Sequence, residues 1–358
     1  MAARGAGPAV SGRPGAPGPA LPAEPEPRGS VARSVLGSPS LRLIGRRLLA
    51  AIPVLWGVTF LTFVVMNLLP GDAAQELLGI NATPAEVKQL SLKLHLNEPF
   101  WVRYGNWLGG AVHGHLGNSL TSGDPVTTVL GQRLPVTFEL VLYAFLISVV
   151  FAVPVALLAA SKPRGIADRL SMMISMAGLS TAPYVLALVL ILVFAVHLPI
   201  LPAIGYVSPS QSIAGNIRSL TLPAISIGFG LFCFYARLLR ADITAQMQAE
   251  DYVVTARAKG LQPRQVLVRH ALRNSLFGLI TVVGLNVGAL IGTTVIIEQI
   301  FSLPGIGQEL LQSINDRDLP VVEACVLIFA VVVVLANLLT DLLYAVLDPR
   351  IRYGRAIA

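Results

Sequence analysis

Charged residues are scarce in this chain of 358 residues: Asp, Glu, Lys and Arg make up 13% of it, while hydrophobic residues make up 54%. In soluble domains about a quarter of the residues are charged. The composition therefore excludes an ordinary water-soluble protein and indicates a membrane protein. Cysteine is also rare, because only Cys233 and Cys325 occur, each inside an apolar run and without CxxC or Cys/His spacing. Neither a disulfide framework nor a metal site is expected.

The sequence also lacks the motifs of several enzyme classes. It has no GxxxxGK[ST] phosphate-binding loop, so we do not expect this chain to hydrolyse ATP. It has no HExxH or GxSxG motif, and no grouping of Ser, His and Asp suggests an intramembrane hydrolase. The net charge is +7, but no basic patch is interleaved with aromatic residues, which argues against nucleic acid as a partner. We expect a protein that is not an enzyme and binds no cofactor itself.

The first 40 residues contain 15 Pro or Gly residues. Such a segment cannot bury enough apolar surface to offset the entropy lost on ordering. We therefore expect residues 1–40 to be a disordered tail and residues 41–354 to form the membrane domain. The first apolar run is too long for a cleavable signal peptide, whose core has about 7–15 residues, so it is predicted to remain as a span.

Six apolar runs are long enough, or nearly long enough, to cross a bilayer, which needs about 20 residues of helix. They cover residues 48–69, 134–160, 170–198, 222–241, 276–297 and 321–347. The sequence thus predicts an all-α membrane protein with six transmembrane helices. Pro154 and Pro183 are expected to kink two of them.

Basic residues are divided unequally between the two sides of such a chain. With a cytoplasmic N-terminus, 20 of the 26 Lys and Arg residues lie in cytoplasmic segments. Because cytoplasmic loops carry an excess of Lys and Arg, both termini are predicted to be cytoplasmic. Residues 70–133 then form the longest extracytoplasmic loop, and residues 242–275 form a cytoplasmic loop.

The extracytoplasmic segments contain further helix signals. Residues 84–94 have a helical pattern, and Trp101, Tyr104 and Trp107 follow at helical spacing. Aromatic residues so spaced mark an interfacial or packed face; contact with a soluble partner, or a lid over a pathway, is the alternative. Residues 301–320 contain a turn, a short amphipathic helix and a Pro stop, and are expected to lie against the membrane.

Polar residues inside spans are candidates for a translocation pathway. Glu139, Glu323 and Asp341 lie near span ends, where snorkelling or local pairing is the simpler interpretation, whereas Asn286 and Asn337 lie deeper.

Glycines recur at spacings near four along the fifth span, and this gives the helix one smooth face: Gly278, Gly284, Gly288 and Gly292. Close helix packing is one explanation for this face, and a passage at the contact of two subunits is the other. The candidate pathway residues are Gly284, Asn286, Gly288 and Glu139.

A polar stretch separates the fourth and fifth spans, EDYVVTARAKGLQPRQVLVRHALRN, residues 250–274. It predicts a short helix over 252–259 with Asp251 as its cap and Gly260 in a left-handed C-terminal cap. A second helix is predicted to begin at Pro263. The result is two helices bent sharply at a glycine.

This bent segment suits insertion into the groove of a partner, although a basic loop holding two membrane helices is the plainer alternative. Small side chains allow close approach of another surface to the first helix, and basic side chains can pair with acidic groups. The candidate coupling residues are Glu250, Asp251, Tyr252, Ala256, Arg257, Ala258, Lys259, Gly260 and Pro263.

Five segments in the same order resemble one transporter family. They are RRLLAAIPVLWGVTFLTFVVMNLLPGD, LPVTFELVL, DYVVTARAKGL with its HALRN continuation, EQIFSLPGIGQ, and LYAVLDPRIRYG. Residues 41–354 resemble the B-type permeases of binding-protein-dependent ABC importers for dipeptides and oligopeptides. The stretch that begins at Glu250 resembles their EAA-type cytoplasmic loop, although Glu250-Asp251 and the long Pro-rich tail depart from the strict pattern.

The resemblance implies a type I ABC importer permease fold and a location in the plasma membrane. It implies four kinds of partner: a related permease in a heterodimer, two cytoplasmic ATPase subunits that use ATP and Mg, an extracytoplasmic binding protein, and lipid. The implied function is ATP-driven import of dipeptides or oligopeptides. Import of a non-peptide ligand such as nickel by the same architecture is the alternative, and a self-sufficient ion-coupled carrier is a more distant one.

Overall fold

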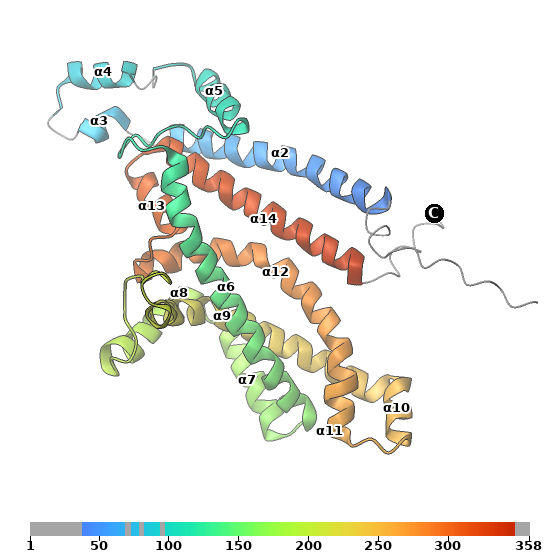
Figure 1. Ribbon diagram of the computed structural model, residues 1–358. Coiled ribbons are helices and arrows are strands. Elements are labelled where there is room, and N and C mark those ends of the chain that lie inside the picture. Colours follow the sequence, from blue (N-terminus) through green and yellow to red (C-terminus); the bar gives the residue numbers. More distant parts are fainter. Residues whose placement is uncertain (1–37, 69–72, 79–81, 94–96, 348–358) are drawn as a thin grey trace, which may run out of the picture.

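The computed structural model describes residues 38–68, 73–78, 82–93 and 97–347, which are helical apart from turns, loops and one isolated bridge between Asn118 and Pro125 (Figure 1). The elements in chain order are α2 (Ser38–Leu68), α3 (Ala73–Leu78), α4 (Pro84–Lys93), α5 (Phe100–Val112), α6 (Val126–Ser161), α7 (Ile166–Ser180), α8 (Pro183–Ile191), the π-helix η1 (Leu192–His197), α9 (Ile213–Ala249), α10 (Asp251–Ala258), α11 (Pro263–Val266), the π-helix η2 (Leu267–Ala271), α12 (Leu272–Phe301), α13 (Ile306–Asn315) and α14 (Leu319–Leu347).

Five of the described helices are long and apolar enough to cross a membrane, and up to seven spans result if each of two bent helix pairs counts as one. The predicted all-α membrane fold is therefore confirmed. Six spans result when α7, α8 and η1 form one broken span and α13 folds back at the end of α12, where the bend is 74°. The predicted tail, the PGD segment and the DPRIRYG segment lie largely or wholly outside the described residues.

Several helix boundaries differ from those expected from hydropathy. The helix α6 begins at Val126 rather than near residue 134, and continues through both Pro135 and Pro154. The apolar run 170–198 is not one kinked helix, because α7 and α8 meet at an angle of 104°. Pro183 begins α8 at its first helical position, where the missing N–H has no intrahelical partner in any case. The helix α9 begins nine residues early, at Ile213, where the Ser212 side chain accepts a hydrogen bond from Gly215 N.

The long helix α9 is the centre of the packing. It contacts α6 along most of its length, and also α7, α8 and α12. Buried apolar side chains from α6, α9 and α12 form one cluster around Leu140, Leu220 and Ile297, and a second around Tyr235 and Leu279. The helices α6 and α9 are in close contact at Gly228, where an added Cβ would lie 2.6 Å from the carbonyl oxygen of Ala144.

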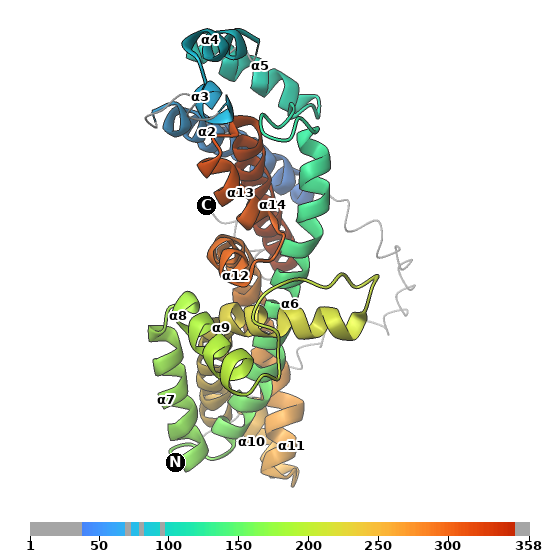
Figure 2. The same ribbon diagram turned by 90° about the vertical axis from the view of Figure 1, so that its left-hand side faces the viewer.

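The helices α2 and α14 pair along the other edge of the molecule, away from α7 and α8 (Figures 1 and 2). Near the start of α2, Arg47 Nη2 lies 3.0 Å from Asp341 Oδ1 of α14. Asp341 thus pairs locally, in agreement with the simpler interpretation of this acid. The Arg133–Glu309 ion pair, at 3.0 Å, joins the start of α6 to α13 in the same way.

The helix α5 packs on α2 through one of the three aromatic residues singled out from the sequence. Tyr104 is buried, its hydroxyl lies 3.0 Å from Thr59 Oγ1, and its ring contacts Phe60 and Phe63. Trp101 is 73% exposed and points away from this contact. The three aromatics therefore do not share one packed face, because residues three apart in a helix differ in direction by about 60°.

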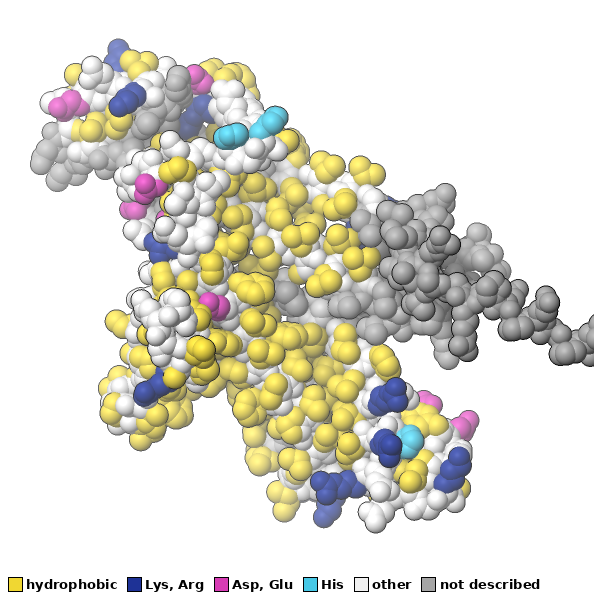
Figure 3. Space-filling view, viewed as in Figure 1, with side chains coloured by type: hydrophobic (Ala, Val, Ile, Leu, Met, Phe, Trp, Pro, Cys, Tyr) yellow, Lys and Arg dark blue, Asp and Glu magenta, His cyan; other side chains and the backbone are white. Residues whose placement is uncertain are grey.

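Hydrophobic side chains cover the broad middle of the molecule in Figure 3, while Lys and Arg gather towards its ends. One end carries α10 and α11, and the opposite end carries α3, α4 and α5 (Figure 1). Many large apolar side chains on α2, α6, α7 and η1 are exposed, among them Leu61, Phe138, Met173 and Val196. This distribution suits a protein whose middle lies in lipid and whose ends lie in water.

The contact at Gly228 predicts an unusual effect of alanine in a helix. Gly→Ala inside a helix normally stabilises by up to about 1 kcal/mol, but Gly228→Ala forces α6 and α9 apart. We expect a loss of about 1–3 kcal/mol, typical of overpacking. The measurement is thermal unfolding of the purified protein in detergent. Gly230→Ala is the matched control, because a Cβ at Gly230 meets nothing within 4 Å; equal melting temperatures for the two variants would contradict the packing described.

Candidate functional site

The first helix of the segment between α9 and α12 is α10, which covers Asp251–Ala258. Glu250, with extended backbone (φ −89°, ψ 130°), occupies the cap position between α9 and α10, and its side chain makes no capping hydrogen bond. The prediction that Asp251 caps the helix is therefore wrong by one residue. Asp251 instead lies in the first turn, where its negative charge interacts favourably with the exposed amides of the helix N-terminus.

The end of α10 is a glycine turn of the Schellman type. Gly260 has φ +79°, as predicted. Its N–H donates to Arg257 O at 2.9 Å, and the N–H of Leu261 donates to Ala256 O at 3.3 Å. These two bonds satisfy carbonyl groups that the helix end would otherwise leave unpaired. Open space surrounds the position of a Cβ at Gly260, so the backbone conformation alone demands glycine here.

The second helix begins at Pro263, as predicted, and its start is fixed by a capping box between Gln262 and Gln265. One turn later the helix widens into the π-helix η2, which covers the HALRN region in part, and then continues as α12. Leu267 and Ala271 of η2 are buried with Leu239 and Ile243 of α9. The chain from Pro263 to Phe301 is thus continuously helical, with a bend within α12 (Figure 1), and it is packed against α9 near its start.

The inner face of α10 packs within the chain. Val253 and Ala256 are buried with Val266 of α11, and Met247 and Tyr252 close the cluster. The expectation that Ala256 offers its backbone to a partner is therefore wrong, because this residue faces α11. Arg257 donates from Nη2 to Met247 O at 3.1 Å, and the Tyr252 hydroxyl donates to the side chain of Gln246.

The outer face of α10 forms a stripe, the docking stripe, of Asp251, Val254, Thr255 and Ala258. These four exposed residues have the spacing i, i+3, i+4 and i+7 of one helix face. Val254 is 63% exposed, which is unusual for an apolar side chain on a polar loop. Lys259 and Gly260 are also exposed at the end of the stripe. Val254 and Thr255 were not predicted from the sequence. Because Val253 and Ala256 face inwards, the helical period places Val254 and Thr255 on the outer face.

A buried ion pair fastens α7 to α9 near the same end of the molecule. Arg240 of α9 donates to Asp168 of α7 through Nε at 2.7 Å and through Nη2 at 2.8 Å. The backbone N–H of Arg164 also donates to Asp168, at 2.8 Å. This bidentate arrangement fixes both distance and orientation between the two helices. Sequence analysis did not predict this ion pair, because no local residue pattern shows that two residues 72 positions apart will meet.

Two of the candidate pathway glycines pack inside the chain. A Cβ at Gly284 would lie 2.7 Å from Thr340 Oγ1 of α14, and one at Gly288 would lie 3.3 Å from Val333. Gly284 and Gly288 thus allow close contact between α12 and α14, which is the packing alternative. Asn286 donates from Nδ2 to Val282 O of its own helix at 2.8 Å. Gly278 and Gly292 have open space where a Cβ would lie, so the four glycines do not form one packed face.

Glu139, the fourth pathway candidate, belongs to a polar network between α6, α9 and the loop before α9. Its Oε2 accepts hydrogen bonds from the Tyr206 hydroxyl and from Asn216 Nδ2, both at 2.9 Å. Tyr143 donates to Asn216 Oδ1, also at 2.9 Å. Burial, together with the Glu139 carboxylate, raises the pKa of Tyr206 to about 12. Tyr206 therefore remains a donor at neutral pH, and Glu139 is held by local partners.

A buried carboxylate that sequence analysis did not single out organises the opposite end of α12. Glu298 accepts a hydrogen bond from Thr137 Oγ1 at 2.8 Å and another from Gln308 N at 3.1 Å. Thr137 Oγ1 in turn accepts from Ile306 N at 2.9 Å. The first turn of α13 is thus bound by groups from α6 and α12. These residues belong to the quoted segments LPVTFELVL and EQIFSLPGIGQ, so the network accounts for two of the five.

Glu323 was expected to extend its carboxylate to the membrane interface or to pair locally, but the structure shows otherwise. It is 1% exposed, and its Oε1 atom has no hydrogen-bond partner among the described residues.

Comparison with known proteins identifies the chain. Residues 152–353 match the family described as binding-protein-dependent transport system inner membrane component, and residues 40–141 match the N-terminal part of such membrane components. The chain belongs to this family. Family members are membrane permease subunits of ABC transporters, and the family membership together with the apolar helices places this permease in a membrane.

Individual relatives cover nearly the whole permease. A dipeptide transport system permease of Alkalihalophilus pseudofirmus is 37% identical over 328 residues, which is 86% of this chain and 98% of the relative. An oligopeptide transport system permease of Bacillus subtilis is 37% identical over 311 residues, 86% of this chain and 98% of the relative. A glutathione transport system permease of Escherichia coli is 34% identical over 313 residues, 87% and 99% of the two chains.

The network at Glu298 predicts that this carboxylate stabilises the start of α13. Glu298→Ala removes the acceptor of the partly buried Gln308 N–H, at a cost of about 1–3 kcal/mol. We expect hydrogen exchange at Ile306 and Gln308 to accelerate about tenfold or more, because 1.4 kcal/mol corresponds to a factor of ten. Gln299→Ala is the control, since Gln299 is the exposed neighbour of Glu298 on α12. Equal exchange in wild type and Glu298→Ala would contradict the role of Glu298.

Proposed function

We propose that this permease is the membrane subunit of an ATP-driven importer of peptides. The observation that carries the proposal is the similarity over nearly the whole permease to relatives named for dipeptides, oligopeptides and glutathione, itself a small peptide. The permease pairs with a related permease, and an extracytoplasmic binding protein delivers the peptide. Import of nickel or transport by a self-sufficient ion-coupled carrier is less well supported, since the relatives cited are named for peptide or glutathione transport.

ATP hydrolysis takes place on two separate cytoplasmic ATPase subunits in this proposal. The docking stripe of α10 is the surface that meets one of them. It offers an apolar side chain, Val254, and two small side chains, Thr255 and Ala258, that let the helix enter a groove. Lys259 lies beside the stripe and can pair with acidic groups of the ATPase. Among the candidate coupling residues, Asp251, Ala258, Lys259 and Gly260 are therefore the ones that face the partner.

Motion of the ATPase is transmitted through fixed contacts. Tyr252 and Ala256 hold α10 against α9 and α11, and Arg257 ties it to Met247. The chain bends at Glu250, between α9 and α10, and at Gly260, between α10 and α11. Pro263 begins the helix that continues into α12. Displacement of α10 therefore moves α9 and α12 together rather than bending the loop. A linkage of this kind suits a transporter that alternates between two states.

The proposed orientation, with both termini in the cytoplasm, predicts which exposed residues can be labelled from each side. The two native cysteines are buried, so they contribute little background to thiol labelling. A membrane-impermeant reagent applied outside intact cells is expected to label Lys88→Cys on α4 but not Lys259→Cys. In inverted vesicles the order reverses. Outside labelling of Lys259→Cys would overturn the cytoplasmic position of the docking stripe.

The docking stripe predicts a separation between membrane assembly and transport. Ala258→Arg places a long charged side chain at the C-terminal end of the docking stripe, whereas Ala241→Arg changes an exposed alanine of α9 outside the stripe. We expect Ala258→Arg to insert normally but to lose ATPase binding and peptide uptake at least tenfold, while Ala241→Arg retains both. The assay is uptake of labelled di- and tripeptides by the reconstituted complex with its binding protein. Normal uptake by Ala258→Arg would refute the docking stripe, and uptake of Ni²⁺ but not peptide would refute the substrate class.

A further inference from the structure

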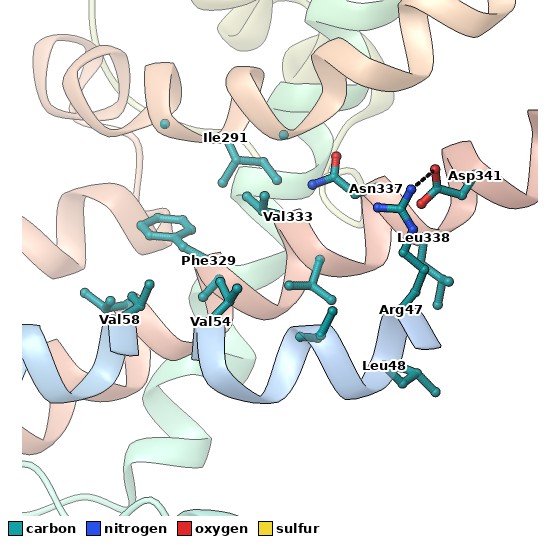
Figure 4. Close-up of a pocket in the computed structure, with 17 residues that line it drawn as sticks. Arg47, Leu48, Val54, Val58, Ile291, Phe329, Val333, Asn337, Leu338 and Asp341 are labelled. Atoms are coloured by element: carbon teal, nitrogen blue, oxygen red, sulfur yellow. Dashed lines mark hydrogen bonds and ion pairs between the residues drawn. The ribbon is translucent and has the colours of Figure 1, made fainter. Parts of the chain in front are cut away.

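A groove lies between α2, α12 and α14, with a volume of about 530 Å³. Val54 and Val58 of α2, Phe329 and Val333 of α14, and Ile291 of α12 line it, as Figure 4 shows. Gly288 and Gly292 lie along its α12 side, and a Cβ at Gly292 would meet nothing within 4 Å. The groove therefore owes part of its width to a missing side chain.

The polar lining residues of the groove all lie at one end. They are Arg47, Asn337 and Asp341, of which Arg47 and Asp341 form the ion pair between α2 and α14. The Arg47 side chain is 56% exposed and uses one N–H in this pair, while a guanidinium has five. The Oδ2 atom of Asp341 has no hydrogen-bond partner among the described residues. The groove is thus apolar along most of its length, and at one end it offers unused N–H donors of Arg47 and the unused acceptor Oδ2 of Asp341.

The length of the groove matches one leaflet of a bilayer. On α2 it extends from Arg47 to Val58, and on α14 from Val326 to Asp341, which correspond to about 16 and about 22 Å of helix at about 1.5 Å per residue. Half of a bilayer measures about 15 Å for its hydrocarbon and about 20–22 Å with its headgroups. These lengths fit a lipid whose acyl chain lies along the apolar part and whose phosphate lies at the Arg47 end.

We propose that this groove is a binding site for a phospholipid of the leaflet on the Arg47 side. One acyl chain lies along Gly292, Phe329 and Val333, and the phosphate lies beside Arg47. A donor of the headgroup, either an ammonium or a hydroxyl group, reaches the Asp341 carboxylate. Under the proposed orientation this is the cytoplasmic leaflet.

Two other occupants fit the groove less well. A peptide would leave its backbone amides without partners along the apolar part, at several kcal/mol for each buried group. A helix of the related permease is about 10 Å or more wide, and its apolar membrane-facing side would offer no partner to the unused donors of Arg47 or to Asp341 Oδ2. An acyl chain requires neither hydrogen bonds nor that width.

The test uses the full permease in nanodiscs whose phospholipid carries a diazirine in one acyl chain, with cross-links mapped by mass spectrometry. We expect labelling of Phe329 and Val333 to exceed that of Leu335 and Leu339 by at least fivefold. Leu335 and Leu339 lie on the same helix and are 52% and 59% exposed, but do not line the groove. Equal labelling of the two sets would overturn the proposal.

Two pairs of variants sharpen the test. Gly292→Leu fills the groove and is expected to lower labelling of Phe329 at least fivefold, whereas Gly278→Leu, also without neighbours within 4 Å, leaves it unchanged. Arg47→Gln is expected to lower labelling at least threefold, and Arg47→Lys to preserve it. Unchanged labelling in Gly292→Leu refutes the site. Displacement of the lipid by added peptide, or cross-linking of a benzoylphenylalanine at Val334 to the related permease in the assembled complex, also refutes it.

Discussion

The left-handed backbone of Gly260 is the constraint on which the cytoplasmic part of the proposed mechanism depends. It turns the chain between α10 and α11 within a few residues, so that Val253 and Ala256 meet Val266. Without this turn α10 would extend as a free arm from the end of α9. With it, the helix is a rigid block whose outer stripe is presented in one orientation. The conformation costs glycine little, but it is strained for other residues even though the space around it is open.

Three groups of hydrogen-bonded polar side chains lie towards the ends of the helix assembly. Asp168 and Arg240 join α7 to α9 near the end that carries α10. At the other end, Glu298 and Thr137 bind the start of α13, and Glu139 binds Tyr206 and Asn216. Between these ends the contacts are apolar, with α6 and α9 in close contact at Gly228. The polar contacts fix the helices to one another at both ends of the assembly. The apolar contacts between these ends are not directional, so the helices can tilt as units.

The sequence predicted the helical class, the bend at Gly260 in the segment 250–274 and the amphipathic α13, because these features depend on local residue patterns. Gly260 and Pro263 act through their own backbone, so their effects are visible in sequence. The inward direction of Ala256 and the break before Pro183 were not predicted, since both depend on what lies opposite. The same holds for Glu298: a lone acid near the end of an apolar run gives no sign that Thr137, 161 positions earlier, will bind it.

The π-helix η2 determines which side of the helix that follows it, α12, faces α14. A π turn contains one residue more than an α turn, so it shifts the rotational phase of everything that follows by about 100°. The extra residue lets Leu267 and Ala271 face α9 while Gly284 and Gly288, farther along, face α14. Removal of one residue from 267–271 would convert the bulge into regular helix and rotate the Gly284 and Gly288 side of α12 away from α14. The packing of α12 therefore depends on the number of residues in η2 as much as on which residues they are.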